Sequence, residues 1–84
     1  MRLAGLDLTD DCVLELIRRL RRADLNHQAD TIEGALVTGQ AEAPLTTPDH
    51  IAVLTVLEDP PVGLAQLRDT LLNEHTAGQR DGLY

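Results

Sequence analysis

The sequence predicts an all-α protein in which four short helices form two helical hairpins, within one small domain spanning residues 1–84. Three stretches carry apolar side chains at spacings of three and four, which is typical of helices that bury one face. Capping residues, prolines and glycines separate the stretches, and the links between them are short. A chain of this length can hold only one small core.

The first helix is expected from about Thr9 to Arg22, because Thr9 or Asp10 can cap it and acidic residues follow in the first turn. At about 100° per residue, one arc of this helix carries only apolar side chains. Its members are Cys12, Val13, Leu16, Ile17 and Leu20. We expect this stripe to face the core.

The second helix follows a link of residues 23–25, so it is expected to pack antiparallel to the first helix. Asn26 is a suitable cap, and Gly39 lies just past the last apolar position, where helices commonly end. The apolar seam of this helix is narrow and consists of Leu25, Ala29, Ile32 and Leu36.

The third helix is expected over residues 48–58, with Thr47 as its cap, Pro48 in its first position and Asp49 in its first turn. The run "IAVLTVL", residues 51–57, is also rich in β-branched residues, so a strand is the alternative. The helical start signal favours the helix.

Apolar side chains cover almost the whole circumference of this third helix. Such a helix is expected to be central in the fold, or to be shared with a second chain. We therefore predict Val53 and Val56 as interaction residues.

The fourth helix is expected over residues 64–76, after the turn "EDPPVG" at residues 58–63. Its stripe consists of Leu64, Leu67, Leu71 and His75, with Leu72 at the edge. The lead-in of residues 1–8 and the tail of residues 77–84 are expected to be frayed.

Four arginines in "IRRLRRADL" lie on the outer face of the first helix, opposite Leu20. They are Arg18, Arg19, Arg21 and Arg22, and we call them the arginine ridge. Glu15 lies one turn earlier, in the favourable order for ion pairs with Arg18 and Arg19. The ridge has three interpretations: a solvated helix face, a surface that docks a protein or subunit, or a nucleic-acid contact.

The charge distribution disfavours nucleic acid. The net charge is −7, and residues 1–22 carry +1 while the rest of the chain carries −8. The surrounding acids would repel phosphates over about 10 Å at moderate salt. Lysine is absent, and Tyr84 is the only aromatic residue on which a base could stack.

The residues that could carry chemistry form no recognisable motif. His27, His50 and His75 fall on different predicted helices and lack partners at metal-ligand spacing. Cys12 lies at the edge of an apolar stripe, where a free thiol acts as a small hydrophobe. We therefore expect no catalytic residue, no metal and no cofactor.

One cysteine cannot form an internal disulfide, and no apolar run approaches the roughly 20 residues of a membrane span. A cytoplasmic protein without a membrane contact is expected. The segments "LIRRLRRADLNHQADTIEGAL" and "PPVGLAQLRDTLLNEHTAGQRDGL" resemble small helical proteins of actinobacteria and their phages. That resemblance implies a helical fold and a cytoplasmic location, and it brings no activity, cofactor or partner.

These observations predict a small non-enzymatic protein-interaction module, an accessory, regulatory or inhibitory factor that self-associates as a homodimer. The alternative is a nucleic-acid-related regulator. It would be a DNA-binding protein or antitoxin that uses the arginine ridge, or an acidic inhibitor that mimics nucleic acid.

Overall fold

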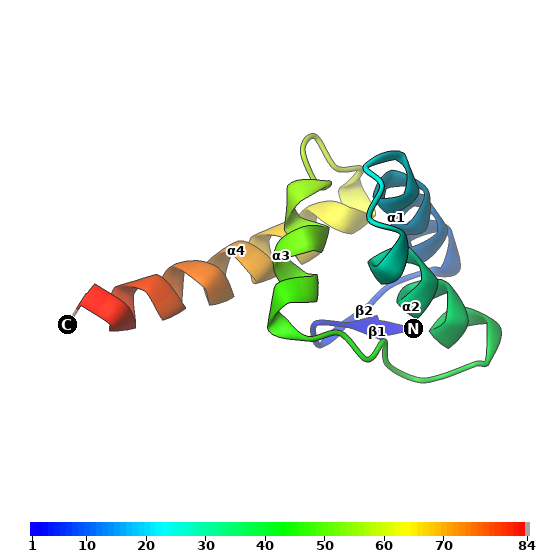
Figure 1. Ribbon diagram of the computed structural model, residues 1–84, viewed down its shortest axis with the longest axis horizontal. Coiled ribbons are helices and arrows are strands. Elements are labelled where there is room, and N and C mark those ends of the chain that lie inside the picture. Colours follow the sequence, from blue (N-terminus) through cyan, green and yellow to red (C-terminus); the bar gives the residue numbers. More distant parts are fainter. Residues whose placement is uncertain (84) are drawn as a thin grey trace.

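A computed structural model describes the backbone of residues 1–83 and the side chains of residues 1–74 (Figure 1). It confirms the predicted all-α single domain of four helices and adds one small antiparallel sheet. In chain order the elements are β1 (Arg2–Leu3), β2 (Leu6–Asp7), α1 (Asp10–Arg22), α2 (Asn26–Val37), α3 (Thr47–Thr55) and α4 (Val62–Leu83).

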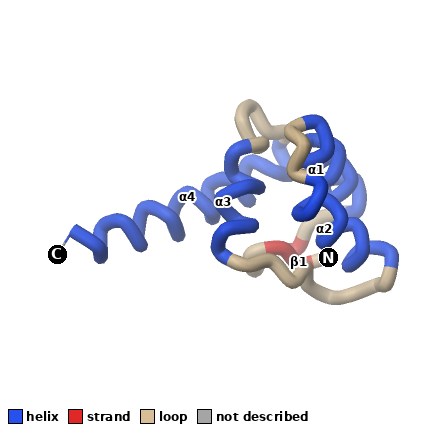
Figure 2. Tube along the Cα trace, viewed as in Figure 1, coloured by secondary structure: helices blue, strands red, loops and turns tan. Residues whose placement is uncertain are grey.

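Helix α1 packs most extensively against α2, and α3 packs against α4, as the two predicted hairpins require (Figure 2). The interior is aliphatic, because the chain has no Phe or Trp. All four helices and the segments between them contribute side chains to it. The core comprises Leu3, Leu8, Val13, Leu16, Ile17, Leu20, Ala29, Ile32, Ala43, Val53, Leu57, Leu64, Leu67 and Leu71.

The N-terminal lead-in was expected to be frayed, and this prediction is wrong. Strands β1 and β2 pair antiparallel, with Leu3 opposite Leu6, through a turn at Ala4 and Gly5 that both have positive φ. Leu3 is fully buried, so the hairpin adds to the core that the helices form. Burial of one face stabilises a strand pair that would not persist alone.

The hairpin is also tied to the loop between α2 and α3. The Arg2 amide donates to the Ala41 carbonyl at 2.8 Å, and the Ala43 amide donates to the Arg2 carbonyl at 3.0 Å. These two hydrogen bonds satisfy the amide and the carbonyl of Arg2 on the side of β1 that faces away from β2. The loop is thereby held against β1 as a short third line of extended chain.

The ends of α1 and α2 follow from local signals, with one correction. The Thr9 hydroxyl accepts a hydrogen bond from the Cys12 amide at 3.3 Å, so Thr9 caps α1 as expected. Asn26 was expected to cap α2 but is its first helical residue, and Leu25 occupies the cap position without a side-chain bond. Gly39 has φ +71° just after α2 and ends the helix as predicted.

Residues 47–55 are helical, so the strand alternative for residues 51–57 is wrong. The cap is Thr46, one residue before the expected position. The Asp49 carboxylate accepts hydrogen bonds from the Thr46 amide and the Thr46 hydroxyl, at 3.1 and 3.0 Å. Helix α3 ends at Thr55 instead of Glu58, because the chain turns early into the loop that leads to α4.

Helix α4 begins two residues before the predicted start and is much longer than residues 64–76. It extends through most of the expected frayed tail to Leu83, and its C-terminal part projects from the body of the domain in Figure 1. No residue in that part breaks a helix in the way that proline does. The expectation for the His75 side chain lies outside the described side chains, as does Tyr84.

Candidate interaction surface on helix α1

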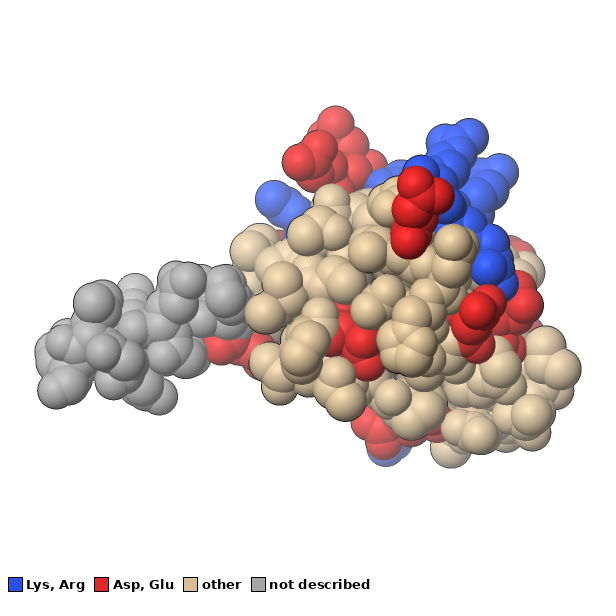
Figure 3. Space-filling view, viewed as in Figure 1, with Lys and Arg blue, Asp and Glu red and all other residues tan. Residues whose placement is uncertain are grey.

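The arginine ridge lies on the outer face of α1, while Leu20 between its members is fully buried. Figure 3 shows basic side chains gathered over this helix, with acidic side chains beside them. The first helical turn carries Asp10 and Asp11, and the last turn carries Arg19, Arg21 and Arg22. Both sets of charges suit the helix dipole. The four arginines of the ridge differ in how free each guanidinium group is to bind another molecule.

Arg18 and Arg19 share Glu15, as the spacing predicts. Arg18 Nη2 lies 2.6 Å from Glu15 Oε1, and Arg19 Nε lies 3.1 Å from Glu15 Oε2. The hydrogen bond from Arg18, followed by that from Arg19, lowers the pKa of Glu15 below its ordinary value. The Arg18 side chain remains 67% exposed, so it is available to another molecule.

Arg19 is a structural link between distant parts of the chain. Its Nη1 donates to the carbonyls of Val56 at 3.3 Å and Glu58 at 3.0 Å, and its Nη2 to that of Asp59 at 3.5 Å. These carbonyls lie where α3 ends and the loop to α4 begins, so they have no helical partner. Arg19 therefore holds the second hairpin against α1 and has little capacity left for an external partner.

Arg21 pairs with α2. Its Nη2 lies 2.9 Å from Asp30 Oδ1 and 3.3 Å from Glu33 Oε1. The hydrogen bond to Asp30, then that to Glu33, raises the pKa of Arg21 above its ordinary value. No acid precedes Arg21 by one turn in the sequence. Only the packing of the two helices reveals these partners.

Arg22 is exposed and, within residues 1–74, has no carboxylate within ion-pairing distance. It borders a shallow hollow of about 290 Å³ between the C-terminal ends of α1 and α3. The half-buried Val56 and Arg19 also line this hollow, so the structure brings three predicted interaction residues together. The complete lining is Arg19, Arg22, Ala23, Thr55, Val56 and Glu58.

Val53 was predicted as an interaction residue, but it is fully buried in the domain's own core. The apolar surface of α3 that suggested a second chain is largely covered by the rest of the fold. Helix α3 lies between α2 and α4, and it contacts both. A central position therefore accounts for Val53, and Ile51, 44% exposed, is the apolar residue of α3 that faces water most.

Leu14 is a surface residue that no sequence pattern marks as an interaction residue. It is 52% exposed and lies outside the buried stripe of α1. Asp10 lies one turn before it and Arg18 one turn after it, on the same face. In the sequence, the one indication of its exposure is that Leu14 lies opposite the buried stripe of α1. A single exposed leucine is common on protein surfaces and does not by itself mark an interaction site.

His27 lies on α2 and His50 lies on α3. His27 is exposed, as expected, and His50 Nδ1 lies 3.8 Å from Glu74 Oε2. The partly exposed Cys12 packs its sulfur against Gly63 at the start of α4. Within the described part of the chain, no three His, Cys, Asp or Glu residues are grouped to hold a metal ion.

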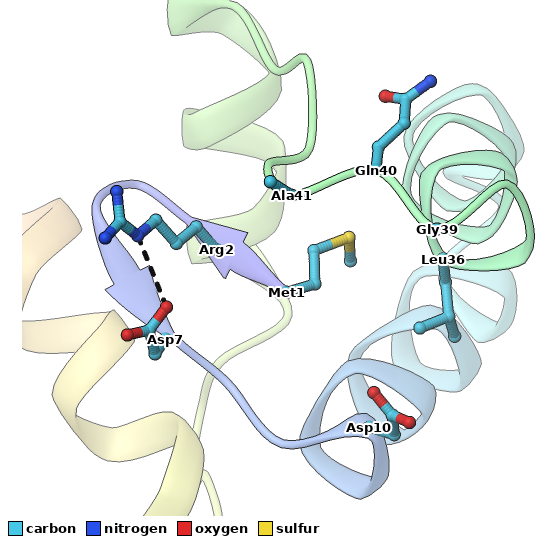
Figure 4. Close-up of a pocket in the computed structure, with 8 residues that line it drawn as sticks. All are labelled: Met1, Arg2, Asp7, Asp10, Leu36, Gly39, Gln40 and Ala41. Carbon is cyan, nitrogen blue, oxygen red and sulfur yellow. Dashed lines mark hydrogen bonds and ion pairs between the residues drawn. The ribbon is translucent and has the colours of Figure 1, made fainter.

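A larger hollow of about 650 Å³ is lined by the N-terminal hairpin, the start of α1, the end of α2 and the loop that follows α2 (Figure 4). Its polar side chains are exposed, and Arg2 Nε pairs with Asp7 Oδ1 at 3.4 Å at the hairpin end. Specific small-molecule sites instead enclose a few convergent polar groups in an apolar pocket. The lining residues are Met1, Arg2, Asp7, Asp10, Leu36, Gly39, Gln40 and Ala41.

No helix in the described residues is both long enough and apolar enough to span a bilayer. Comparisons of the chain with protein-family models, with curated proteins and with solved structures gave no significant match.

Proposed function

We propose that this protein is a small non-enzymatic interaction module, an accessory or regulatory factor that self-associates through the outer face of α1. One observation carries the proposal. Leu14 is half-exposed at the centre of a helix face, with the exposed Asp10 one turn before it and the exposed Arg18 one turn after it. Apolar groups surrounded by charges are the composition expected of a contact with another protein.

The burial of Leu14 would supply the hydrophobic part of such a contact. Apolar surface removed from water contributes about 25 cal/mol per Å², so one leucine gives a modest affinity. Charged groups at the rim add specificity and a faster approach of the partners. The proposal includes a cytoplasmic location, which the single cysteine favours.

The nucleic-acid alternative has less support. Three of the four arginines in the ridge already bond to groups of their own chain. Arg22 and the exposed part of Arg18 are left to meet a phosphate, and the salt dependence and affinity of DNA binding scale with the number of phosphates that are neutralised. A helix face with so few available arginines is better suited to carboxylates of a protein.

The mass of the protein in solution tests self-association. Sedimentation equilibrium between about 10 µM and about 1 mM covers the range of weak protein contacts. We expect a concentration-dependent rise towards the dimer mass, which Leu14→Asp abolishes. Val37→Asp is the matched control, because Val37 is 79% exposed and belongs to α2, not to α1. A constant monomer mass over the whole range would refute the proposal.

A further inference from the structure

The outer face of α1 is arranged symmetrically about Leu14. Asp10 lies four residues before Leu14 and Arg18 four residues after it, so each is about 6 Å from it along the helix axis. On the helix these three residues fall within an arc of about 80°. All three are exposed. The charge changes sign across the leucine.

A face with this order of charges is complementary to itself. If a second copy is turned by 180° about an axis through Leu14, its Arg18 lies opposite Asp10, and its Asp10 lies opposite Arg18. The two leucines then meet at the centre. An isologous contact of this kind uses the same patch twice, as most homodimers do.

We propose that α1 packs antiparallel against α1 of a second copy, with the two-fold axis at Leu14 and two symmetric Asp10–Arg18 ion pairs across the contact. This inference rests on the proposed function and specifies its partner and geometry. Asp11 lies beside Asp10 and strengthens the acidic end that receives the partner's Arg18.

The described contacts leave the necessary groups available. The single hydrogen bond between Arg18 and Glu15 uses Nη2, so the other N–H groups of that guanidinium can donate to a partner. A shallow hollow of about 260 Å³ lies at the same place, lined by Asp11, Leu14, Glu15 and Arg18. This hollow offers room for the partner's Leu14 beside the two-fold axis.

The contact is small, because one face of a 13-residue helix forms it. It belongs among weak interfaces that bury less than about 1,200 Å² in total. Exposed ion pairs across it are screened by salt with a Debye length of about 10 Å at 0.1 M. We therefore expect a dissociation constant in the micromolar range that rises with ionic strength.

A charge-swap experiment tests the geometry. Variant one, Asp10→Arg with Asp11→Arg, gives both ends of the face basic side chains. Variant two, Arg18→Glu, gives both ends acidic side chains. We expect each variant alone to self-associate at least about tenfold more weakly than the wild type, because like charges oppose each other. An equimolar mixture of the two should form a heterodimer at least as tightly as the wild type dimerises.

Matched controls separate this effect from net charge and from folding. Asp69→Arg reverses one acidic charge and Arg68→Glu reverses one basic charge at exposed positions of α4, and each should leave dimerisation within about twofold of wild type. Far-ultraviolet circular dichroism checks that the substitutions in the first turn of α1 preserve the helix, because that turn favours acidic residues.

Cross-linking tests the position of the axis. In a Cys12→Ala background, Leu14→Cys should form an intermolecular disulfide under mild oxidation, since this requires Cα atoms within about 7 Å. Val37→Cys is more exposed and should cross-link more slowly if it lies outside the contact.

Each result distinguishes the inference from the proposed function. A wild-type dimer that is insensitive to the charge swap, or in which Val37→Cys cross-links as fast as Leu14→Cys, would overturn the α1 geometry and leave self-association intact. A wild-type protein that stays monomeric would overturn both.

Discussion

The buried carboxylate of Asp49 supports the sharpest prediction about stability. It is 8% exposed and accepts three hydrogen bonds. The Thr46 amide and hydroxyl donate at 3.1 and 3.0 Å, and Gln28 Nε2 donates from α2 at 3.1 Å. Asp49 therefore fixes the start of α3 and also joins α3 to α2. The test is Asp49→Ala.

The expected cost is about 2 kcal/mol. Loss of a capping interaction costs about 0.5–2 kcal/mol, and Asp49→Ala also leaves the half-buried Gln28 amide without its acceptor. Water reaches the exposed Thr46 and recovers part of its bonding, so the two losses do not add in full. For a domain of this size, the melting temperature should fall by about 8–16 °C.

The pH dependence gives an independent check. The hydrogen bond from the Thr46 amide is the main cause that lowers the pKa of Asp49, and the side chains of Gln28 and Thr46 assist it against the opposing effect of burial. A carboxyl with a lowered folded-state pKa stabilises the fold fully above the unfolded pKa of about 3.9. The contribution is lost as the pH falls through the lower folded-state value.

Urea denaturation of the wild type and of Asp49→Ala at pH 7 and at several values below pH 4 measures both effects. The difference between the two proteins should shrink as the medium becomes more acidic. Asp69→Ala, at an exposed position of α4, is the control and should change stability by less than about 0.5 kcal/mol. An Asp49→Ala cost below about 0.5 kcal/mol at pH 7, or a difference independent of pH, would refute the reasoning.

Three further predictions follow from single contacts. Gly63→Ala should destabilise the fold by about 1–2 kcal/mol, because the new Cβ collides with the Cys12 sulfur, and Cys12→Ala should restore most of the loss in thermal melts. Arg19→Ala should cost about 1–2 kcal/mol in urea denaturation by releasing the carbonyls after α3, while Arg22→Ala should cost less than about 0.5 kcal/mol. A gel shift with duplex DNA at low salt should show no complex for wild type, and a complex lost in Arg18→Ala with Arg22→Ala would revive the nucleic-acid alternative.

The helices and their ends were largely predictable, because the signals for them are local. Leu16 and Leu20 share a buried face as their spacing requires, and Gly39 ends α2 through its own backbone freedom. The prediction failed for the first eight residues. Two-residue strands carry too short a pattern to be recognised, and the loop that completes their pairing lies about forty residues away.

The candidate surface was predicted only in part. The helical spacing placed the four arginines on the outer face of the first helix. It did not indicate that Arg19 and Arg21 have partners on other elements. It also marked Val53 for an external partner, whereas α2 and α4 cover it. The exposure of Leu14 depends on which elements cover it, so only the tertiary structure reveals it.

The amino-acid sequence by itself determined an aliphatic, helical domain with a basic ridge on its first helix, because helix periodicity, capping and charge order depend on neighbours within a few residues. Only the tertiary structure decided which arginines remain available, which valine is interior, and which leucine faces water. These outcomes depend on contacts between residues that are nine to forty positions apart. Their geometry is set by how the two hairpins pack, which no local pattern specifies.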